Sequence, residues 1–149
     1  MEIPTATPPV ATLAPLVPYL TCSPAAAAIE WYGRVFGATV VGDVYPMGRD
    51  QPDSVGHAEL RVGGSSIYLS DEHLPVGAVA PTTLGGATTA FVLVVEDMDS
   101  LYERAVVAGA AADRPPEDQP YGSRAGWFTD PFGHRWSIQT PLGDHEPTE

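Results

Sequence analysis

The amino-acid sequence predicts an α+β protein built from two tandem βαβββ modules, and three observations lead to this prediction. The pair Gly63-Gly64 separates two segments in which polar and apolar residues alternate, which is typical of a β-hairpin. Residues 130–133, Asp-Pro-Phe-Gly, are a second strong turn signal between two further strand-like segments. A helical pattern precedes each hairpin, and both helices end in the dipeptide Gly-Ala. The order of elements in the first half is therefore repeated in the second.

Composition supports one compact unit and narrows the choice of partners. The 149 residues are 44% hydrophobic and 17% charged, as in globular proteins. The formal net charge of -12 argues against nucleic acid or an anionic membrane as partner. A negative surface favours a cationic ligand, although it also serves simply to keep a protein soluble.

The sequence favours a cytoplasmic protein. No apolar stretch is long enough to span a bilayer, and the first residues lack the basic region and apolar core of a signal peptide. The single cysteine, Cys22, has no partner for an internal disulfide and is expected to be a small packed side chain.

The first module is predicted to cover residues 15–72. Residues 1–14 are rich in proline without periodicity and are expected to form a flexible or extended arm. Residues 17–22 predict a strand, and Pro18 within it indicates an edge or a bulge.

A helix and a strand follow. Ser23 is the predicted N-cap, Pro24 the first helical residue and Gly37 the end of the helix. The helix has one apolar stripe, which is expected to pack in the core and comprises Ile29, Tyr32 and Phe36. Residues 38–44 predict a strand, and 45–55 a loop over the sheet.

The hairpin around Gly63-Gly64 predicts a sheet with two different faces. With this turn, Glu59 lies opposite Tyr68, and Leu60 lies opposite Ile67. One face, here called the front, is polar and carries His57, Glu59, Arg61, Ser66, Tyr68 and Ser70. The other face, the back, is apolar and suited to cover a helix; it carries Ala58, Leu60, Val62, Ile67 and Leu69.

The second module is predicted over residues 90–141, after a linker at 73–89 with little regular structure. Residues 90–95 predict a strand, and Asp97 is the expected N-cap of a helix with an apolar stripe of Met98, Leu101, Ala105 and Ala108. A proline-rich segment at 113–121 leads into the second hairpin. Its last strand alternates Arg135, Ser137 and Gln139 with Trp136, Ile138 and Thr140, and an acidic tail at 142–149 follows.

Four segments together resemble a known superfamily. They are AAAAIEWYGRVFGA, GHAELRVGGSSIYLSDE, VVEDMDSLYERAVVAGA and PPEDQPYGSRAGWFTDPFGHRWSI. They resemble the glyoxalase, bleomycin-resistance and extradiol dioxygenase superfamily, the vicinal oxygen chelate proteins, over roughly residues 16–141. The resemblance implies curled mixed sheets that form open cups, usually completed in a homodimer.

The metalloenzymes of this superfamily hold a divalent ion with His, Gln or Glu from the first and last strands of each module. Alignment on the first helix and on the Asp-Pro-x-Gly turn places those positions at Val17, Tyr68, Ala90 and Ser137. None of these is a good ligand at neutral pH, and a shift by two residues still gives no three good donors. The resemblance therefore predicts a branch with no metal and no cofactor.

A relocated metal cluster stays open as an alternative, formed by His57, Glu59, Glu72 and His73. Against it stand ordinary roles: a hydrogen-bonded His57 and a Glu59 paired with Arg61. His134, in the turn, is expected to be exposed or to cap the turn.

The predicted cup has apolar and aromatic walls with a few fixed polar groups, which suits a small organic molecule. Its predicted ligand-binding residues are Tyr19, Thr21, His57, Glu59, Arg61, Tyr68, Ser70, Val92, Val94, Trp127, Arg135, Ser137 and Gln139.

The sequence leads to two hypotheses for the function. In the first, similar to the antibiotic-resistance members of the superfamily, a cytoplasmic homodimer sequesters an aromatic or cationic natural product without chemistry. In the second, the protein is a metal-independent isomerase or lyase. Glu59 or His57 is then the general base, and Tyr68 or Arg135 stabilises an oxyanion.

Overall fold

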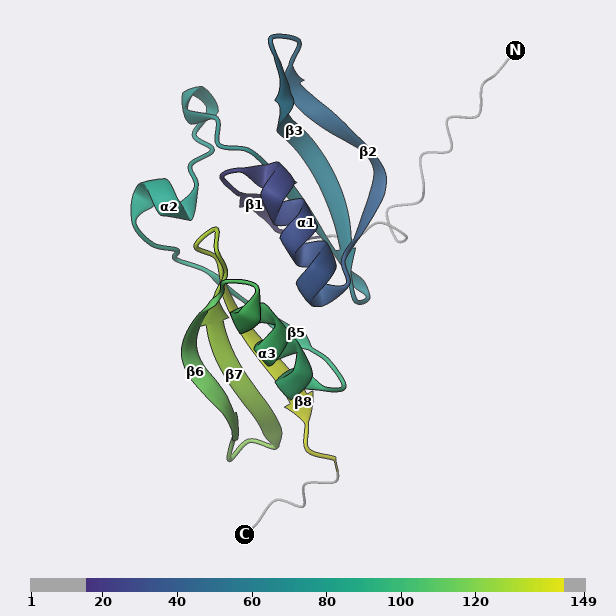
Figure 1. Ribbon diagram of the computed structural model, residues 1–149, viewed down its shortest axis with the longest axis vertical. Coiled ribbons are helices and arrows are strands. Elements are labelled where there is room, and N and C mark those ends of the chain that lie inside the picture. Colours follow the sequence, from purple (N-terminus) through teal and green to yellow (C-terminus); the bar gives the residue numbers. More distant parts are fainter. Residues whose placement is uncertain (1–15, 144–149) are drawn as a thin grey trace, which may run out of the picture.

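The computed structural model describes residues 16–143 and confirms the predicted α+β fold (Figure 1). The first module consists of β1 (Tyr19–Thr21), α1 (Ala25–Phe36), β2 (Thr39–Gly48), β3 (Gln51–Val62) and β4 (Ser65–Ser70). The second consists of β5 (Ala90–Val94), α3 (Met98–Val107), β6 (Ala111–Asp118), β7 (Ser123–Thr129) and β8 (Arg135–Pro141). Between them lie a 3-10 helix, η2 (Leu74–Val76), and a short helix, α2 (Pro81–Leu84). None of the helices in this part of the chain has the length and apolar character needed to cross a membrane.

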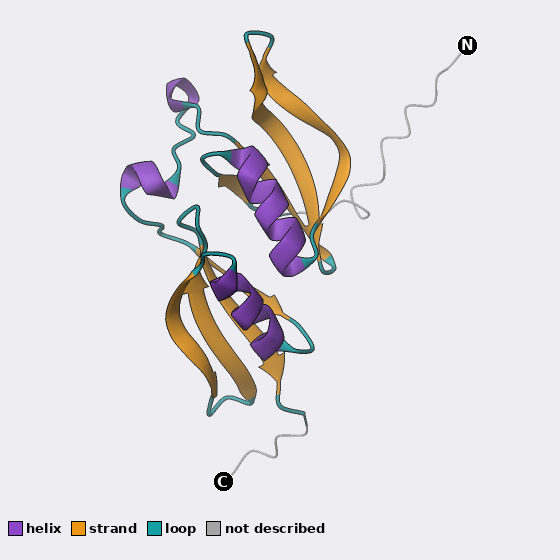
Figure 2. Cartoon of the chain, viewed as in Figure 1, coloured by secondary structure: helices purple, strands orange, loops and turns teal. Residues whose placement is uncertain are grey.

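Each module contains one four-stranded mixed sheet. The strand orders are β1-β4-β3-β2 and β5-β8-β7-β6, with β1 parallel to β4 and β5 parallel to β8. Figure 2 shows α1 and α3 on the same side of their modules, so each sheet has a covered back. Neither helix covers the fronts.

The register of β3 and β4 confirms the prediction. Glu59 lies opposite Tyr68, and Leu60 lies opposite Ile67. Leu60 and Ile67 are buried, whereas Glu59 and Tyr68 remain half-buried. Because side chains alternate along a strand, this register separates a packed back from an accessible front.

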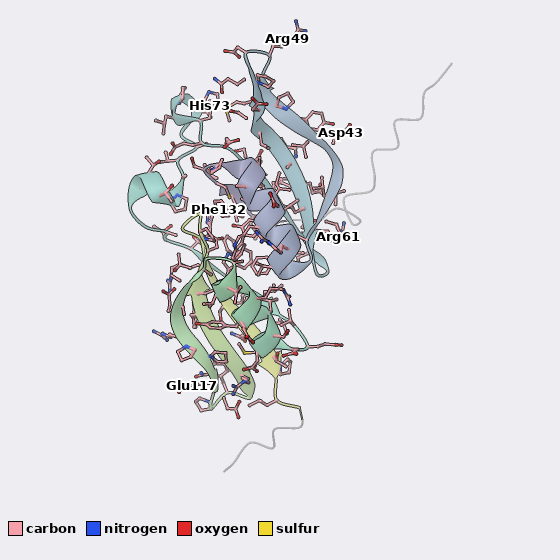
Figure 3. All side chains as sticks on the ribbon, in the orientation of Figure 1. Asp43, Arg49, Arg61, His73, Glu117 and Phe132 are labelled. Atoms are coloured by element: carbon pink, nitrogen blue, oxygen red, sulfur yellow. The ribbon has the colours of Figure 1, made fainter. Side chains whose placement is uncertain are left out.

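Aromatic residues of α1 join the two modules into one core. Tyr32 lies 5.7 Å from Trp136 and 6.2 Å from Phe132, measured between ring centroids. Trp31 lies 6.1 Å from Phe128 by the same measure. Figure 3 places Phe132 at the junction of the modules. Helix α1 therefore packs against both modules.

The Asp130 carboxylate connects α1 to the β7–β8 turn. Its Oδ1 accepts hydrogen bonds from the backbone N–H of Phe132 (2.8 Å) and of His134 (3.0 Å), which confirms the predicted turn. Its Oδ2 accepts hydrogen bonds from the Tyr32 hydroxyl and, at 2.9 Å, from the Trp136 indole. Burial, followed by the negative charge of Asp130, raises the pKa of Tyr32 well above its usual value, so Tyr32 remains a donor.

Two proline-containing segments form strands, and the first of them was predicted to be a loop. The loop prediction for 45–55 is wrong, because β2 continues to Gly48 and β3 begins at Gln51, with Arg49 at the tip of the hairpin (Figure 3). Residues 111–118 likewise form β6. Both β2 and β6 are edge strands with register shifts, and proline is tolerated at such positions.

The predicted N-cap of α1 is also wrong. The helix begins at Ala25, no side chain of its own segment caps it, and Asp71 accepts a hydrogen bond from the Ala25 N–H at 2.9 Å. Residues 73–89 contain two short helices rather than a plain linker. The arm predicted at 1–14 and most of the tail lie outside the described residues.

Candidate functional site

On the front of the first sheet, several predicted ligand-binding residues are register partners on adjacent strands. Tyr19 on β1 is the register partner of Tyr68 on β4, which in turn pairs with Glu59 on β3. His57, two residues before Glu59, shares its face and pairs with Tyr45 on β2. The topology thus collects aromatic side chains from all four strands on one surface.

These side chains form the front aromatic cluster, defined as Tyr19, Tyr45, His57 and Tyr68. The His57 ring centroid lies 4.9 Å from that of Tyr68, 5.6 Å from Tyr19 and 6.4 Å from Tyr45. The rings of Tyr19 and Tyr68 are 5.7 Å apart and nearly perpendicular, at 80°. Tyr19 and Tyr45 are 53% and 55% exposed, so the cluster faces solvent.

The Tyr19 hydroxyl orients His57. Its oxygen lies 2.8 Å from Nδ1 of His57 and 3.3 Å from the Gly56 carbonyl oxygen. Both contacts are satisfied when the hydroxyl donates to Gly56 and accepts from a protonated Nδ1, which leaves the Nε2 lone pair of a neutral His57 free. Burial raises the pKa of Tyr19, so its hydroxyl keeps its proton near neutral pH.

Glu59 carries a half-buried carboxylate without a protein partner among the described residues. The ion pair expected between Glu59 and Arg61 does not form; across residues 16–143, the ion pairs are those that Arg124 makes with Asp99 and Asp118. Its register partner Tyr68 makes no hydrogen bond with it. The carboxylate is therefore available to a ligand.

A cavity of about 880 Å³ opens beside this carboxylate, at the junction of the two modules. Glu59, Arg61 and Tyr68 line it from the front of the first sheet, and Ala90 and Val92 line it from β5. This volume lies within the range of small-molecule sites.

A second cavity, of about 370 Å³, is lined by β1 and by part of the segment between the modules, and its lining includes Tyr19, Thr21 and His134. The expectation of an exposed His134 is wrong: it is 9% exposed, and its Nε2 lies 2.9 Å from the Thr21 carbonyl oxygen. Ser70 is 7% exposed, and its hydroxyl donates to the Asp71 carbonyl at 3.1 Å. His134 and Ser70 therefore hold the backbone rather than face an open cup.

The front of the second sheet combines exposed and covered residues. Val92 and Val94 are exposed, and the Arg135 guanidinium lies 5.0 Å from the centre of the Trp127 ring. Ser137, predicted to line the cup, is completely buried, and the Gln139 amide donates to its hydroxyl at 3.2 Å. Val92, Val94 and Arg135 are therefore accessible on this face, and Ser137 is not.

The residues at the superfamily's metal positions do not fit a divalent ion. The register places Tyr19, not Val17, beside Tyr68, and Val92, not Ala90, beside Ser137. Two tyrosines, a valine and a buried serine offer no set of three good donors. No group of three His, Cys, Asp or Glu side chains suited to a metal comes together within residues 16–143 either, so the relocated cluster around His57 is not assembled here.

The sequence prediction missed Tyr45, which lies in the segment wrongly assigned to a loop. A register shift between Val41 and Tyr45 places Tyr45 opposite His57. A simple count along a regular strand does not give this pairing. The apolar pair Val44 and Tyr45 was an available signal, but Pro46 and Pro52, which follow it, favoured a loop.

Comparison with known proteins shows the family of this chain. Residues 12–138 match the family model described as the Glyoxalase/Bleomycin resistance protein/Dioxygenase superfamily. Uncharacterized proteins of Mycobacterium bovis and Mycobacterium tuberculosis are each 37% identical over 131 residues, which are 85% of this chain and 83% and 74% of theirs.

Solved structures show the same fold. TioX from Micromonospora sp. ML1 is 26% identical, with a TM-score of 0.63 over 89% of this chain and all of that one (100%). Protein PA1353 from Pseudomonas aeruginosa is 25% identical, with a TM-score of 0.66 over 87% of this chain and 98% of that one.

Proposed function

Because this chain belongs to the glyoxalase/bleomycin resistance protein/dioxygenase superfamily, we propose that it binds and sequesters a small organic molecule without a metal ion. The observation that supports this most is the cavity of about 880 Å³, with the Tyr68 ring and the Glu59 carboxylate in its wall, the latter without an ion-pair partner within residues 16–143. The cavity offers shape, an aromatic surface and two charged groups of opposite sign, Glu59 and Arg61, of which Arg61 is exposed and Glu59 is half-buried. These are the features of a binding site for an aromatic or cationic compound.

Sequestration suits this site better than chemistry. The positions that carry the metal in the superfamily's metalloenzymes hold Tyr19, Tyr68, Val92 and Ser137 here, so the usual Lewis acid has no donor set. A protein that sequesters a toxic compound needs only a high affinity for it and a concentration at least equal to that of the compound. In this proposal the protein confers resistance or self-protection in the cytoplasm, where its single buried cysteine, Cys22, stays a free thiol.

One observation favours a second candidate, a metal-independent isomerase or lyase. The 2.8 Å contact between the Tyr19 hydroxyl and His57 Nδ1 fixes the imidazole and leaves its Nε2 as a possible base. Glu59, on the same face, is the alternative base. The two candidates differ in the fate of the ligand, which mass spectrometry after incubation reveals: sequestration returns it unchanged, and catalysis converts it.

A thermal-shift screen tests the proposal. We expect an aromatic or amine-containing natural product to raise the melting temperature by roughly 5–10 °C at about 100 times its dissociation constant. Divalent zinc, nickel, iron or manganese ions alone are expected to give no saturating rise, because no three donors converge. A saturating shift with one of these ions, and none with organic compounds, would contradict the proposal.

We further propose a homodimer with two equivalent cups. The fronts leave apolar side chains exposed, among them Val92 and Val94 at 59% and 60% and Tyr19 at 53%. A two-fold partner would cover such a surface and close the cups. Light scattering at micromolar concentration is expected to give twice the chain mass of 15.7 kDa. A mass equal to one chain would refute the dimer and leave the cavity within the chain as the binding site.

A further inference from the structure

The front aromatic cluster gathers four rings on one exposed surface. His57 is its centre, within 4.9–6.4 Å of the other three rings, and the rings of Tyr19 and Tyr68 stand at 80° to each other. Perpendicular rings present electron-rich faces from different directions. Because the His57 imidazole occupies the centre of the cluster, a cation would lie on the solvent-exposed side of the rings, where the ring quadrupoles attract an organic cation more strongly than a neutral apolar group of equal size.

The rings of the cluster are accessible to a ligand. Tyr19 and Tyr45 are 53% and 55% exposed, whereas Tyr32 in the core is covered. Neither helix lies on this face, and the hydroxyl of Tyr19 is used to orient His57 rather than to bond across the core. The cluster is thus preorganised and open.

The charges around the cluster favour a cation as well. Glu59 pairs in register with Tyr68 and is two residues from His57 on the same face, and its carboxylate has no partner among the described residues. Arg61, the nearest cationic residue along β3, lies one step beyond Glu59, on the side away from His57. A positive group over the rings therefore meets Glu59 before it meets Arg61.

We propose that the front aromatic cluster binds the ammonium group of an organic ligand, with Glu59 as its counter-ion. This inference rests on the proposed small-molecule binding and specifies the chemical class of the ligand. The Tyr68 ring and the Glu59 carboxylate also line the cavity of about 880 Å³, so the rest of the ligand extends into that cavity. The site therefore favours a ligand with a small, positively charged group at one end. The other end of the ligand lies in the cavity.

The test compares choline with 3,3-dimethylbutan-1-ol, which has the same shape without the charge. Titration of the full-length chain, followed by backbone amide NMR shifts at His57 and Tyr68, is expected to show choline binding about 5- to 30-fold more tightly. Equal affinities would overturn the ammonium site. In that case, a neutral ligand found by thermal shift would still support small-molecule binding. The ammonium site and the proposed small-molecule binding can therefore be refuted independently. Absence of choline binding would also overturn the ammonium site.

Substitutions at Tyr45 distinguish the contribution of its aromatic ring to choline binding from that of its hydroxyl. Tyr45→Phe keeps the ring and is expected to keep choline affinity within about threefold, whereas Tyr45→Leu is expected to lose about fivefold or more. Tyr121→Leu is the matched control, because Tyr121 is also a surface tyrosine, 63% exposed, outside the cluster. Glu59→Gln should weaken choline and leave the neutral alcohol unchanged. Equal losses in Tyr45→Leu and Tyr121→Leu, with folding verified by near-ultraviolet circular dichroism, would overturn the proposal.

Discussion

Asp130→Ala is expected to lower the free energy of unfolding by about 3–5 kcal/mol in chemical denaturation, enough to unfold much of a marginally stable domain. The side chain is 3% exposed and accepts four hydrogen bonds. Alanine would leave the Tyr32 hydroxyl and the Trp136 indole buried without their acceptor. The same substitution would also loosen α1 from the second module, because Tyr32 belongs to α1 and Asp130 to the β7–β8 turn.

Two further variants show whether this loss comes from the buried network. Asp118→Ala removes a carboxylate whose side chain is 65% exposed and which bonds Arg124 at 3.0 Å, and it is expected to leave stability nearly unchanged. Asp130→Asn keeps one acceptor oxygen for the turn but presents a donor to Trp136, so an intermediate loss is expected. Equal stabilities of the Asp118 and Asp130 alanine variants would refute the role of the buried carboxylate.

The fold was predictable where local pattern and tertiary packing agree. Gly63-Gly64 fixes the turn, and the period of two then fixes which residues face the helix, so the register of Glu59 and Tyr68 followed from the sequence. The N-cap of α1 did not follow, because its acceptor is Asp71, which is 46 residues away from Ala25 in the chain. A short-range pattern carries no information about such a partner.

The sequence predicted which face of the sheet carries the site, but not which residues on that face are exposed. Glu59, Arg61 and Tyr68 were placed on the front by alternation, and they line the large cavity. Ser137 has the same alternation and yet is fully buried, and its hydroxyl accepts a hydrogen bond from the Gln139 side chain. Alternation determines the face that a residue occupies, whereas exposure depends on neighbouring side chains. Arg135 and Trp127 likewise show that a front residue can be partly engaged by its neighbour.

The two faces of the first sheet should respond differently to substitution. Ile67→Ala is expected to destabilise the fold, but Ile67 also borders the cavity, so its cross-strand partner Leu60 gives the cleaner test. Leu60 is 1% exposed and packs on the back. Leu60→Ala is expected to lower the free energy of unfolding by about 2–5 kcal/mol, because it leaves a cavity in the core.

Tyr68→Ala should produce the opposite result, a nearly intact fold that has lost its ligand. Tyr68 is half-buried on the front, where its ring contacts His57 and Tyr19 rather than the core, so a stability loss of about 1 kcal/mol is expected. Calorimetric titration with choline, or with a ligand from the thermal screen, should show binding reduced at least tenfold in Tyr68→Ala. In Leu60→Ala, binding should be unchanged under conditions where that variant is folded. If Tyr68→Ala proved to be the unfolding variant and Leu60→Ala the one that loses ligand, the binding face would be the back of the sheet. Because Leu60 and Tyr68 lie on adjacent strands with their side chains on opposite faces, the pair locates the ligand on one face or the other.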